Sequence, residues 1–279
     1  MDVKDLLLFL EAGEPCGPQL DLALALAVRE GATLTGLAVC HEPPIDPADC
    51  YAIGPQGVVD VLARREETIN RGLAVSEAAF RAAVAERGLA GEWAPPSLLE
   101  APDDLALHAR WFDLAVVGAA GGADSFSHRL AEAVALTSGA PCLVAPKQGR
   151  AAAGFDTVVV AWDGSRAARR ALADGLVFLR PARRVRLAVV GGDPAEAAAE
   201  ASIEAILRHL ARHGVEAGLD RIAAGHAGAG AALLEHCAAS SADLLIMGAY
   251  GHARALERVL GGVTRTILTR ATLPVLLSH

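Results

Sequence analysis

A pattern the size of one folded unit occurs twice along this chain of 279 residues. Apolar runs with the length of strands alternate with segments that have the spacing of helices, first over residues 1–147 and again over residues 155–279. Such alternation is typical of an α/β fold built on a parallel sheet. The segment KQGRAAAG, residues 147–154, has neither period, so we interpret it as a linker between two domains.

Each copy contains five predicted strands and four predicted helices, which makes it a short doubly wound unit. In the first copy we expect strands at 4–11, 33–39, 91–94, 113–119 and 140–145, and helices near 17–30, 58–87, 102–112 and 128–138. In the second copy we expect strands at 156–162, 184–190, 215–223, 242–248 and 273–278, and helices near 165–179, 194–213, 229–240 and 261–271. Residues 43–57 form a predicted loop of unusual length.

Connections between parallel strands are right-handed crossovers, which leaves few topologies for such a unit. Ligands bind beyond the carboxyl ends of the strands, at the point where the strand order reverses. In this fold we expect the reversal between the first and the fourth strand of each copy. The residues that follow these two strands are therefore the candidates for a binding site.

Charge and composition exclude several classes of function. The formal net charge of −8 argues against a nucleic-acid groove or an anionic membrane surface as the main partner. No apolar run approaches the ~20 residues of a membrane span, and the apolar run near the start lies between acidic residues, as in a strand rather than a signal peptide. We therefore expect a cytoplasmic protein. The five cysteines show no CxxC spacing, which favours reduced thiols over disulfides or a zinc site.

The segment GAYGHARALERVLGGVT, residues 248–264, combines four glycines with the start of a predicted helix. Gly261 and Gly262 would each cost the helix up to ~1 kcal/mol relative to alanine, which makes sense where a ligand must approach the backbone. The N-terminus of a helix offers unpaired N–H groups and a partial positive charge. With Asp163 after the first strand of this copy, the pattern predicts a phosphate site, although glycines also serve simply as turns between strand and helix.

The spacing Gly-x2-Gly-x9-Gly-(Ser/Thr)-Val-Thr in this segment resembles the nucleotide-binding signature of the universal stress protein family. Residues 248–264 resemble the signature at every position but Gly262, where the family usually has Ser or Thr. The stretches VVVAWDGSRAARRAL and ADLLIMGAYG resemble the family's first strand and helix and its fourth strand. Two copies in one chain are similar to the tandem members, and they imply two domains with the fold of the adenine nucleotide alpha hydrolases.

The resemblance also implies which residues would contact ATP or a related adenine nucleotide. They are Asp163, Val189, Val190, Gly248, Gly251, Gly261, Gly262, Val263 and Thr264. The first three would lie at the adenine and ribose end, the next two would let the backbone pass close to the ribose and phosphates, and the last four would hold the phosphates, with Thr264 donating its hydroxyl. Mg²⁺ would be carried on the phosphates rather than by protein ligands. His252 and Arg254 either contact a phosphate or lie solvated in the loop.

The matching stretch of the first copy, GAAGGADSFSHRLAEAV at 118–134, lacks these glycines at the helix start. Counting thirteen residues from Gly118 and from Gly248 sets Ala131-Glu132 opposite Gly261-Gly262, while Glu11 stands opposite Asp163. Because a fixed carboxylate repels a phosphate, we expect the first copy to bind no nucleotide and to act as a packing partner. Its last strand, 141–145, would pair with 274–277 in an internal pseudo-dimer, and a homodimer is a further possibility.

The function expected from these features is that of a nucleotide-dependent stress-response sensor or regulator of an unidentified protein partner. No Walker lysine, second metal-binding carboxylate or water-orienting base is present, so we assign no catalytic residue and expect slow ATP hydrolysis at most. Ser165 precedes a helix and is interpreted as its N-cap. Two alternatives remain: an interaction protein of the same fold that binds no nucleotide, and an ATP pyrophosphatase, which would need a phosphate loop that AWDGSRAARR does not supply.

Overall fold

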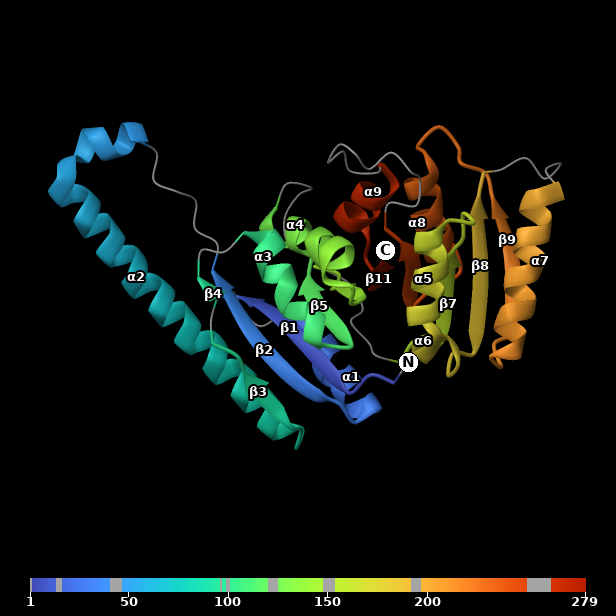
Figure 1. The fold of residues 1–279 in the computed structure, drawn as a ribbon, viewed down its shortest axis with the longest axis horizontal. Coiled ribbons are helices and arrows are strands. Elements are labelled where there is room, and N and C mark those ends of the chain that lie inside the picture. The colour runs from blue at the N-terminus through green and yellow to red at the C-terminus, as the bar shows by residue number, and fades with distance from the viewer. Residues whose placement is uncertain are drawn as a thin grey trace.

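The structure is a computed structural model and describes residues 2–13, 17–40, 47–95, 97–98, 101–119, 125–147, 154–191, 197–249 and 262–279. Within these residues eleven strands form one sheet, in the order β3-β2-β1-β5-β6-β11-β10-β7-β8-β9, with β4 paired to β2. Figure 1 shows the elements of the N-terminal half at one end of this sheet and those of the C-terminal half at the other. The predicted α/β class with a mostly parallel sheet is confirmed.

The N-terminal half is defined here as the elements from β1 to β6. They are β1 (Asp5–Glu11), α1 (Pro18–Glu30), β2 (Thr33–Cys40), α2 (Pro47–Glu86), β3 (Gly91–Trp93), β4 (Ser97–Leu98), α3 (Pro102–Leu107), the 3₁₀ helix η1 (His108–Trp111), β5 (Leu114–Gly118), α4 (Phe126–Ala133), the π-helical turn η2 (Val134–Ser138) and β6 (Cys142–Ala145). Most bounds lie within a few residues of the predicted ones, but β4 was not predicted.

The C-terminal half is defined as the elements from β7 to β11. They are β7 (Thr157–Ala161), α5 (Arg166–Asp174), α6 (Leu176–Leu179), β8 (Arg184–Val190), α7 (Ala197–Arg212), β9 (Ala217–Ile222), α8 (Ala229–Ala239), β10 (Leu244–Gly248), α9 (Gly262–Arg270) and β11 (Val275–Ser278). The helix predicted over 165–179 is interrupted at Gly175, where a methyl group would lie 3.0 Å from the Ala171 carbonyl oxygen and closer still to Ile246.

Helix α2 corrects the prediction of a long loop over residues 43–57. Residues 41–46 lie outside the described part, but a helix runs from Pro47 to Glu86 with one non-helical residue, Gly54, at φ 68° and ψ 173°. Pro55 follows this break. Proline suits the first turn of a helix because its missing N–H would have no partner there. Despite the length of α2, no helix in the described ranges is long and apolar enough to span a bilayer.

Helices cover both faces of the sheet, and each face has its own apolar core. Side chains from α1, α2, α5, α6 and α7 pack on one face, and side chains from α3, α4, α8 and α9 pack on the other. The first core crosses between the halves, because Arg29 of α1 lies over the rings of Phe155 and Phe178, at 5.7 and 5.2 Å from their centroids. This contact and the shared core join the two halves.

The two halves also meet through their last strands. β6 and β11 pair antiparallel, with Leu143 opposite Leu276 and Val144 opposite Val275, whereas the other strand pairs of the described residues are parallel. The predicted pairing of these strands within one chain is confirmed. Pairing gives each strand a partner for its backbone N–H and C=O groups, so neither is left as an exposed edge.

Candidate functional site

The strand order places the candidate site between β7 and β10. These strands are neighbours, although β8 and β9 extend the sheet on one side and β11 on the other. The chain therefore reverses its direction of growth here, and the connections that leave the carboxyl ends of β7 and β10 diverge to opposite faces. In doubly wound sheets this divergence opens a crevice for a ligand. The N-terminal half has the same arrangement at β1 and β5.

Asp163 lies at this crevice, two residues after β7. Its carboxylate oxygen Oδ1 accepts a hydrogen bond from the Ser165 amide at 2.9 Å, and Gly164 between them has a φ of 74°. Ser165 in turn accepts a hydrogen bond from the Ala168 amide at 3.1 Å through its hydroxyl oxygen. The prediction that Ser165 caps the following helix is confirmed. Asp163 remains exposed, held by a local turn at the mouth of the crevice.

Gly248, the last residue of β10, has a structural role of its own. A methyl group there would lie 2.9 Å from the Ala167 Cβ and closer still to backbone atoms of Ala167 and Ala168. Helix α5 therefore packs against β10 at a distance that excludes any side chain. This packing is sufficient reason for glycine at position 248, whether or not a ligand passes nearby.

Helix α9 begins at Gly262, and its first turn has two different faces. Gly262 is exposed, and a methyl group added there would meet nothing within 4 Å. Val263 is also exposed, whereas Thr264 is 3% exposed and shares the buried face of α9 with Ile267 and Leu268. The predicted site residues Gly251 and Gly261 lie outside the described residues, as do His252 and Arg254. Among the described residues, nothing covers α9 on its Gly262 side.

The valines predicted to line a base pocket end strand β8. Val189 and Val190 are both partly buried, and they pack against opposite faces of the sheet. Because successive strand residues point to opposite faces, the two cannot contact one ligand face together. The prediction did not choose between them.

The register of the strands shows how the two halves correspond. In the N-terminal half Gly118 of β5 pairs with Ala145 of β6, and in the C-terminal half Gly248 of β10 pairs with Ser278 of β11. The connection that contains α4 or α9 is therefore three residues longer in the C-terminal half. Counted back from the last strand, the buried positions of the helix coincide, Val134 with Ile267 and Ala135 with Leu268, so the extra residues precede the helix.

This correspondence corrects the alignment of residues 118–134 with residues 248–264 that the sequence analysis used. Counted back from the last strand, Gly261 and Gly262 stand opposite His128 and Arg129, and not opposite Ala131 and Glu132. Glu132 lies inside α4, with Oε1 at 3.3 Å from the Nε2 atom of buried His128. Glu132 therefore does not lie where a phosphate would bind, and its charge does not explain why the N-terminal half would bind no nucleotide.

A different feature closes part of the corresponding crevice in the N-terminal half. Glu11, which does stand opposite Asp163, accepts a hydrogen bond from the hydroxyl of buried Ser127 on α4. A cavity of about 310 Å³ remains beside this bond, with Gln19 and Lys147 among its lining residues. The sequence analysis does not detect this contact between β1 and the first turn of α4, because it places the start of the helix at residue 128 instead of Phe126.

Three described cysteines carry buried thiols, Cys40, Cys142 and Cys237, and none forms a disulfide. Burial raises the pKa of the Cys142 thiol and raises that of Cys237 to about 12, so both stay protonated. Among the residues that the structure describes, no group of three His, Cys, Asp or Glu side chains is arranged to hold a metal ion.

Comparison with known proteins gives a family match for the C-terminal half and a fold for the whole chain. The profile of the Universal stress protein family matches residues 154–279. A universal stress protein from Archaeoglobus fulgidus DSM 4304 is similar over 98% of this chain and 95% of its own, with a TM-score of 0.70 at 17% identity. A putative universal stress protein from Pseudomonas aeruginosa UCBPP-PA14 is similar over 99% and 93%, with a TM-score of 0.62 at 13% identity. A comparison with curated proteins finds no match.

Proposed function

Because residues 154–279 match the profile of the universal stress protein family, we propose that the C-terminal half of this chain binds ATP or a related adenine nucleotide. The nucleotide would lie in the crevice between β7 and β10. The tandem arrangement of two such units, which the whole-chain similarity fits, makes residues 1–147 and 155–279 the two domains of this proposal.

The observation that supports the proposal most directly is the start of α9. Gly262 begins this helix at the reversal point of the sheet, with open space where a side chain would lie. The first N–H groups of a helix have no partner inside the helix, and the dipole favours negative charge there. Among the described residues, nothing lies within 4 Å of the place of a side chain at Gly262, which leaves room for an anion near the first N–H groups of α9.

The residues of the site would divide their roles along the nucleotide. Exposed Asp163 would accept hydrogen bonds from ribose hydroxyls or the adenine amino group, and the end of β8 at Val189 or Val190 would contact the base. The amides of Gly262 and Val263 would bind phosphate oxygens. The hydroxyl usually supplied by the family at position 262 is absent, so affinity would be lower by the loss of one charge-assisted hydrogen bond, about 1.5–3 kcal/mol.

Mg²⁺ would enter with the nucleotide, since this ion keeps most of its water and binds phosphate oxygens readily. The ion would neutralise phosphate charge, and the protein would supply orientation alone. We assign no hydrolytic residue. The activity proposed is therefore that of a sensor or regulatory module in the cytoplasm, in which the bound nucleotide changes the surface presented to a protein partner.

The test is binding of ATP to the purified chain, by native mass spectrometry and calorimetry. We expect one nucleotide per chain. Gly262→Glu would place a carboxylate in the open space at the start of α9 and should lower the affinity more than tenfold. Thr269→Glu adds the same charge to the exposed side of α9 two turns later, and it should leave the affinity nearly unchanged.

An equal affinity of the wild type and Gly262→Glu would show that the phosphates do not lie at α9. Failure of the wild type to bind ATP at millimolar concentration would favour the alternative of an interaction protein without nucleotide. Multiple turnovers of ATP at rates of an enzyme would contradict the assignment of no catalytic residue.

A further inference from the structure

A second open feature lies at the other end of the strands, in the N-terminal half. A groove of about 510 Å³ runs over the amino-terminal ends of β1, β2 and β3, on the face that α3 and η1 cover in part. The side chains that matter here are Asp5, Thr33, Thr35, Glu92, Trp111 and Phe112. The proposed nucleotide lies at carboxyl strand ends, so this groove is separate from it.

The C-terminal half shows what occupies the corresponding place there. Leu34 pairs with Gly91 as Val185 pairs with Ala217, so Thr35 corresponds to Arg186, Glu92 to Gly218 and Ala94 to Asp220. The guanidinium of Arg186 lies across β9. A methyl group on Gly218 would be 2.9 Å from its central carbon. A guanidinium group of the chain itself therefore fills this place in the C-terminal half.

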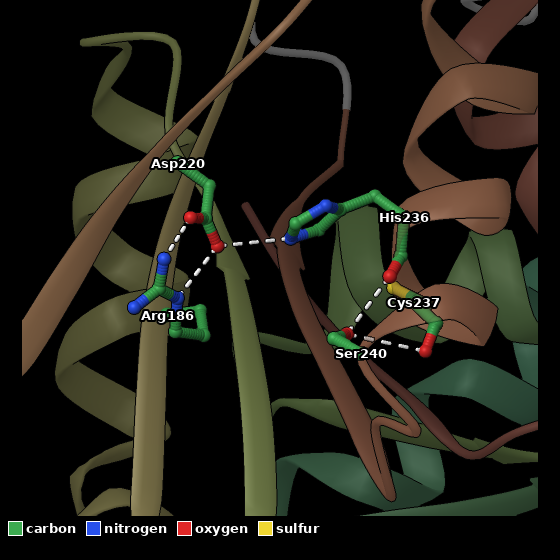
Figure 2. A network of polar contacts seen from close by, with 5 residues as sticks. All are labelled: Arg186, Asp220, His236, Cys237 and Ser240. Atoms are coloured by element: carbon green, nitrogen blue, oxygen red, sulfur yellow. Dashed lines mark hydrogen bonds and ion pairs between the residues drawn. The ribbon is translucent and has the colours of Figure 1, made fainter.

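Polar partners hold that guanidinium in position. Arg186 Nε donates to Asp220 Oδ2 at 2.6 Å, and a second guanidinium nitrogen donates to Asp220 Oδ1. His236 Nε2 of α8 lies 3.0 Å from the same Asp220 Oδ2. Figure 2 shows Asp220 between the Arg186 guanidinium and the His236 imidazole, with Ser240 contacting the backbone carbonyls of His236 and Cys237 instead of the imidazole.

The N-terminal half has the opposite set of charges in the same place. Threonine replaces the arginine, and Glu92 replaces the glycine over which the guanidinium lies. Asp5 adds a second carboxylate to the groove. Within the described part of the chain, no cationic side chain is paired with Asp5 or Glu92.

Two further side chains point to a ligand in the groove. Thr35 lines the groove and is only 8% exposed, and its hydroxyl has no hydrogen-bond partner among the described residues. Trp111 is 76% exposed at the edge of the groove, where the C-terminal half has Ser241. An exposed indole beside two carboxylates is suited to a cation that can also stack on an aromatic face.

We propose that this groove binds a guanidinium group supplied from outside the chain, above the place that Arg186 fills in the other half, because the Glu92 Cβ lies where that guanidinium would be. Glu92 and Asp5 would accept its N–H donors, Thr35 would accept a further hydrogen bond from the floor, and the Trp111 indole would stack on its plane. A planar guanidinium fits this set better than an ammonium ion, because it offers a fork of donors and a flat face.

The binding test uses N-acetyl-arginine methylamide as the probe and its neutral citrulline analogue as the control, followed by calorimetry and by the indole N–H resonance of Trp111. We expect the arginine compound to bind and the citrulline compound to bind at least tenfold more weakly. Methylguanidinium shows whether the guanidinium group comes from a small molecule or from a peptide. An affinity equal to that of the arginine probe would indicate a small guanidino compound. An affinity ten times lower would indicate an arginine within a peptide.

Variants test the residues. Glu92→Gln should weaken the arginine probe about tenfold, as expected for one charge-assisted contact. Glu86→Gln removes the same charge from the exposed end of α2 and should leave binding unchanged. The triple variant Thr35→Arg, Glu92→Gly, Ala94→Asp copies the pairing of Arg186 with Asp220 over a glycine, and it should abolish binding while the protein stays folded.

Three results would overturn the proposal: no binding of the arginine probe at millimolar concentration, equal binding of the citrulline control, or an equal effect of Glu86→Gln and Glu92→Gln. Because all these measurements are made without ATP, their failure would leave the nucleotide proposal untouched, and the reverse also holds.

Discussion

Asp113 and Asp243 hold the same position in the two halves of the chain. The carboxylate oxygen Oδ2 of Asp113 accepts hydrogen bonds from the amides of Lys4 and Asp5 at 2.7 and 3.0 Å. The same oxygen of Asp243 accepts the equivalent bonds at the start of β7, at 3.1 and 2.9 Å. The aspartate that precedes β5 therefore fixes the start of β1, and the aspartate that precedes β10 fixes the start of β7. Each contact sets the register between the two strands.

Loss of this carboxylate should destabilise the fold. In Asp243→Ala the two amides at the start of β7 lose a charged acceptor, and we expect the free energy of unfolding to fall by about 1.5–3 kcal/mol in urea denaturation. Asp156→Ala is the matched control. Its exposed carboxylate pairs with Arg183 at 3.5 Å, a contact expected to contribute at most about 0.5–1 kcal/mol. Equal losses in both variants would contradict the role given to Asp243.

Two glycines of the candidate site should respond differently to alanine. At Gly248 the added methyl group would collide with the backbone of α5, so Gly248→Ala should cost about 1–3 kcal/mol of unfolding free energy. At Gly262 there is open space, and alanine is the better helix former, so Gly262→Ala should leave stability unchanged or raise it by up to about 1 kcal/mol. Urea denaturation of both variants compares them directly. A similar loss of unfolding free energy in both would show that a side chain at position 262 meets other atoms of the protein.

The order and type of the elements could be predicted from the sequence because strands and helices have different periods of apolar residues. The pairing of β6 with β11 was also predictable, since a repeated unit with two exposed edges of the same kind must cover them. The N-cap at Ser165 followed from the hydroxyl that precedes a helical run. These features depend on short stretches of chain or on one symmetry argument.

Other features depend on contacts that no local pattern records. Gly54 and Pro55 allow one helix to restart after a break, so α2 extends through residues interpreted as loop. Glu132 was misaligned because the extra residues of the C-terminal half precede the helix, where counting from Gly248 cannot detect them. The contact between Arg186, Asp220 and His236 joins two strands and a helix, and it required the strand register.

The shared sheet should make the two halves unfold together. Leu276 is fully buried and pairs with Leu143 across the junction, so Leu276→Ala should cost about 2–5 kcal/mol. Trp93 and Trp111 report on the N-terminal half and Trp162 on the C-terminal half. We expect variants that keep only one set of tryptophans to give coincident urea transitions, both shifted equally by Leu276→Ala. Separate transitions, or a shift in only one of them, would mean that the junction does not couple the halves.

The contact between Asp220 and Arg186 predicts a dependence of stability on pH. The hydrogen bond from Arg186 lowers the pKa of the Asp220 carboxyl in the folded protein. A carboxyl whose folded pKa is lowered stabilises the protein above its unfolded pKa, about 3.9, and loses that contribution as pH falls toward the folded pKa. Asp220→Asn should therefore be less stable than the wild type between about pH 5 and pH 7. The difference should shrink below about pH 4. Urea denaturation at several pH values measures it, with Asp156→Asn as an exposed control. A difference that persists undiminished at pH 3 would show that the ionised carboxylate is not what stabilises this contact.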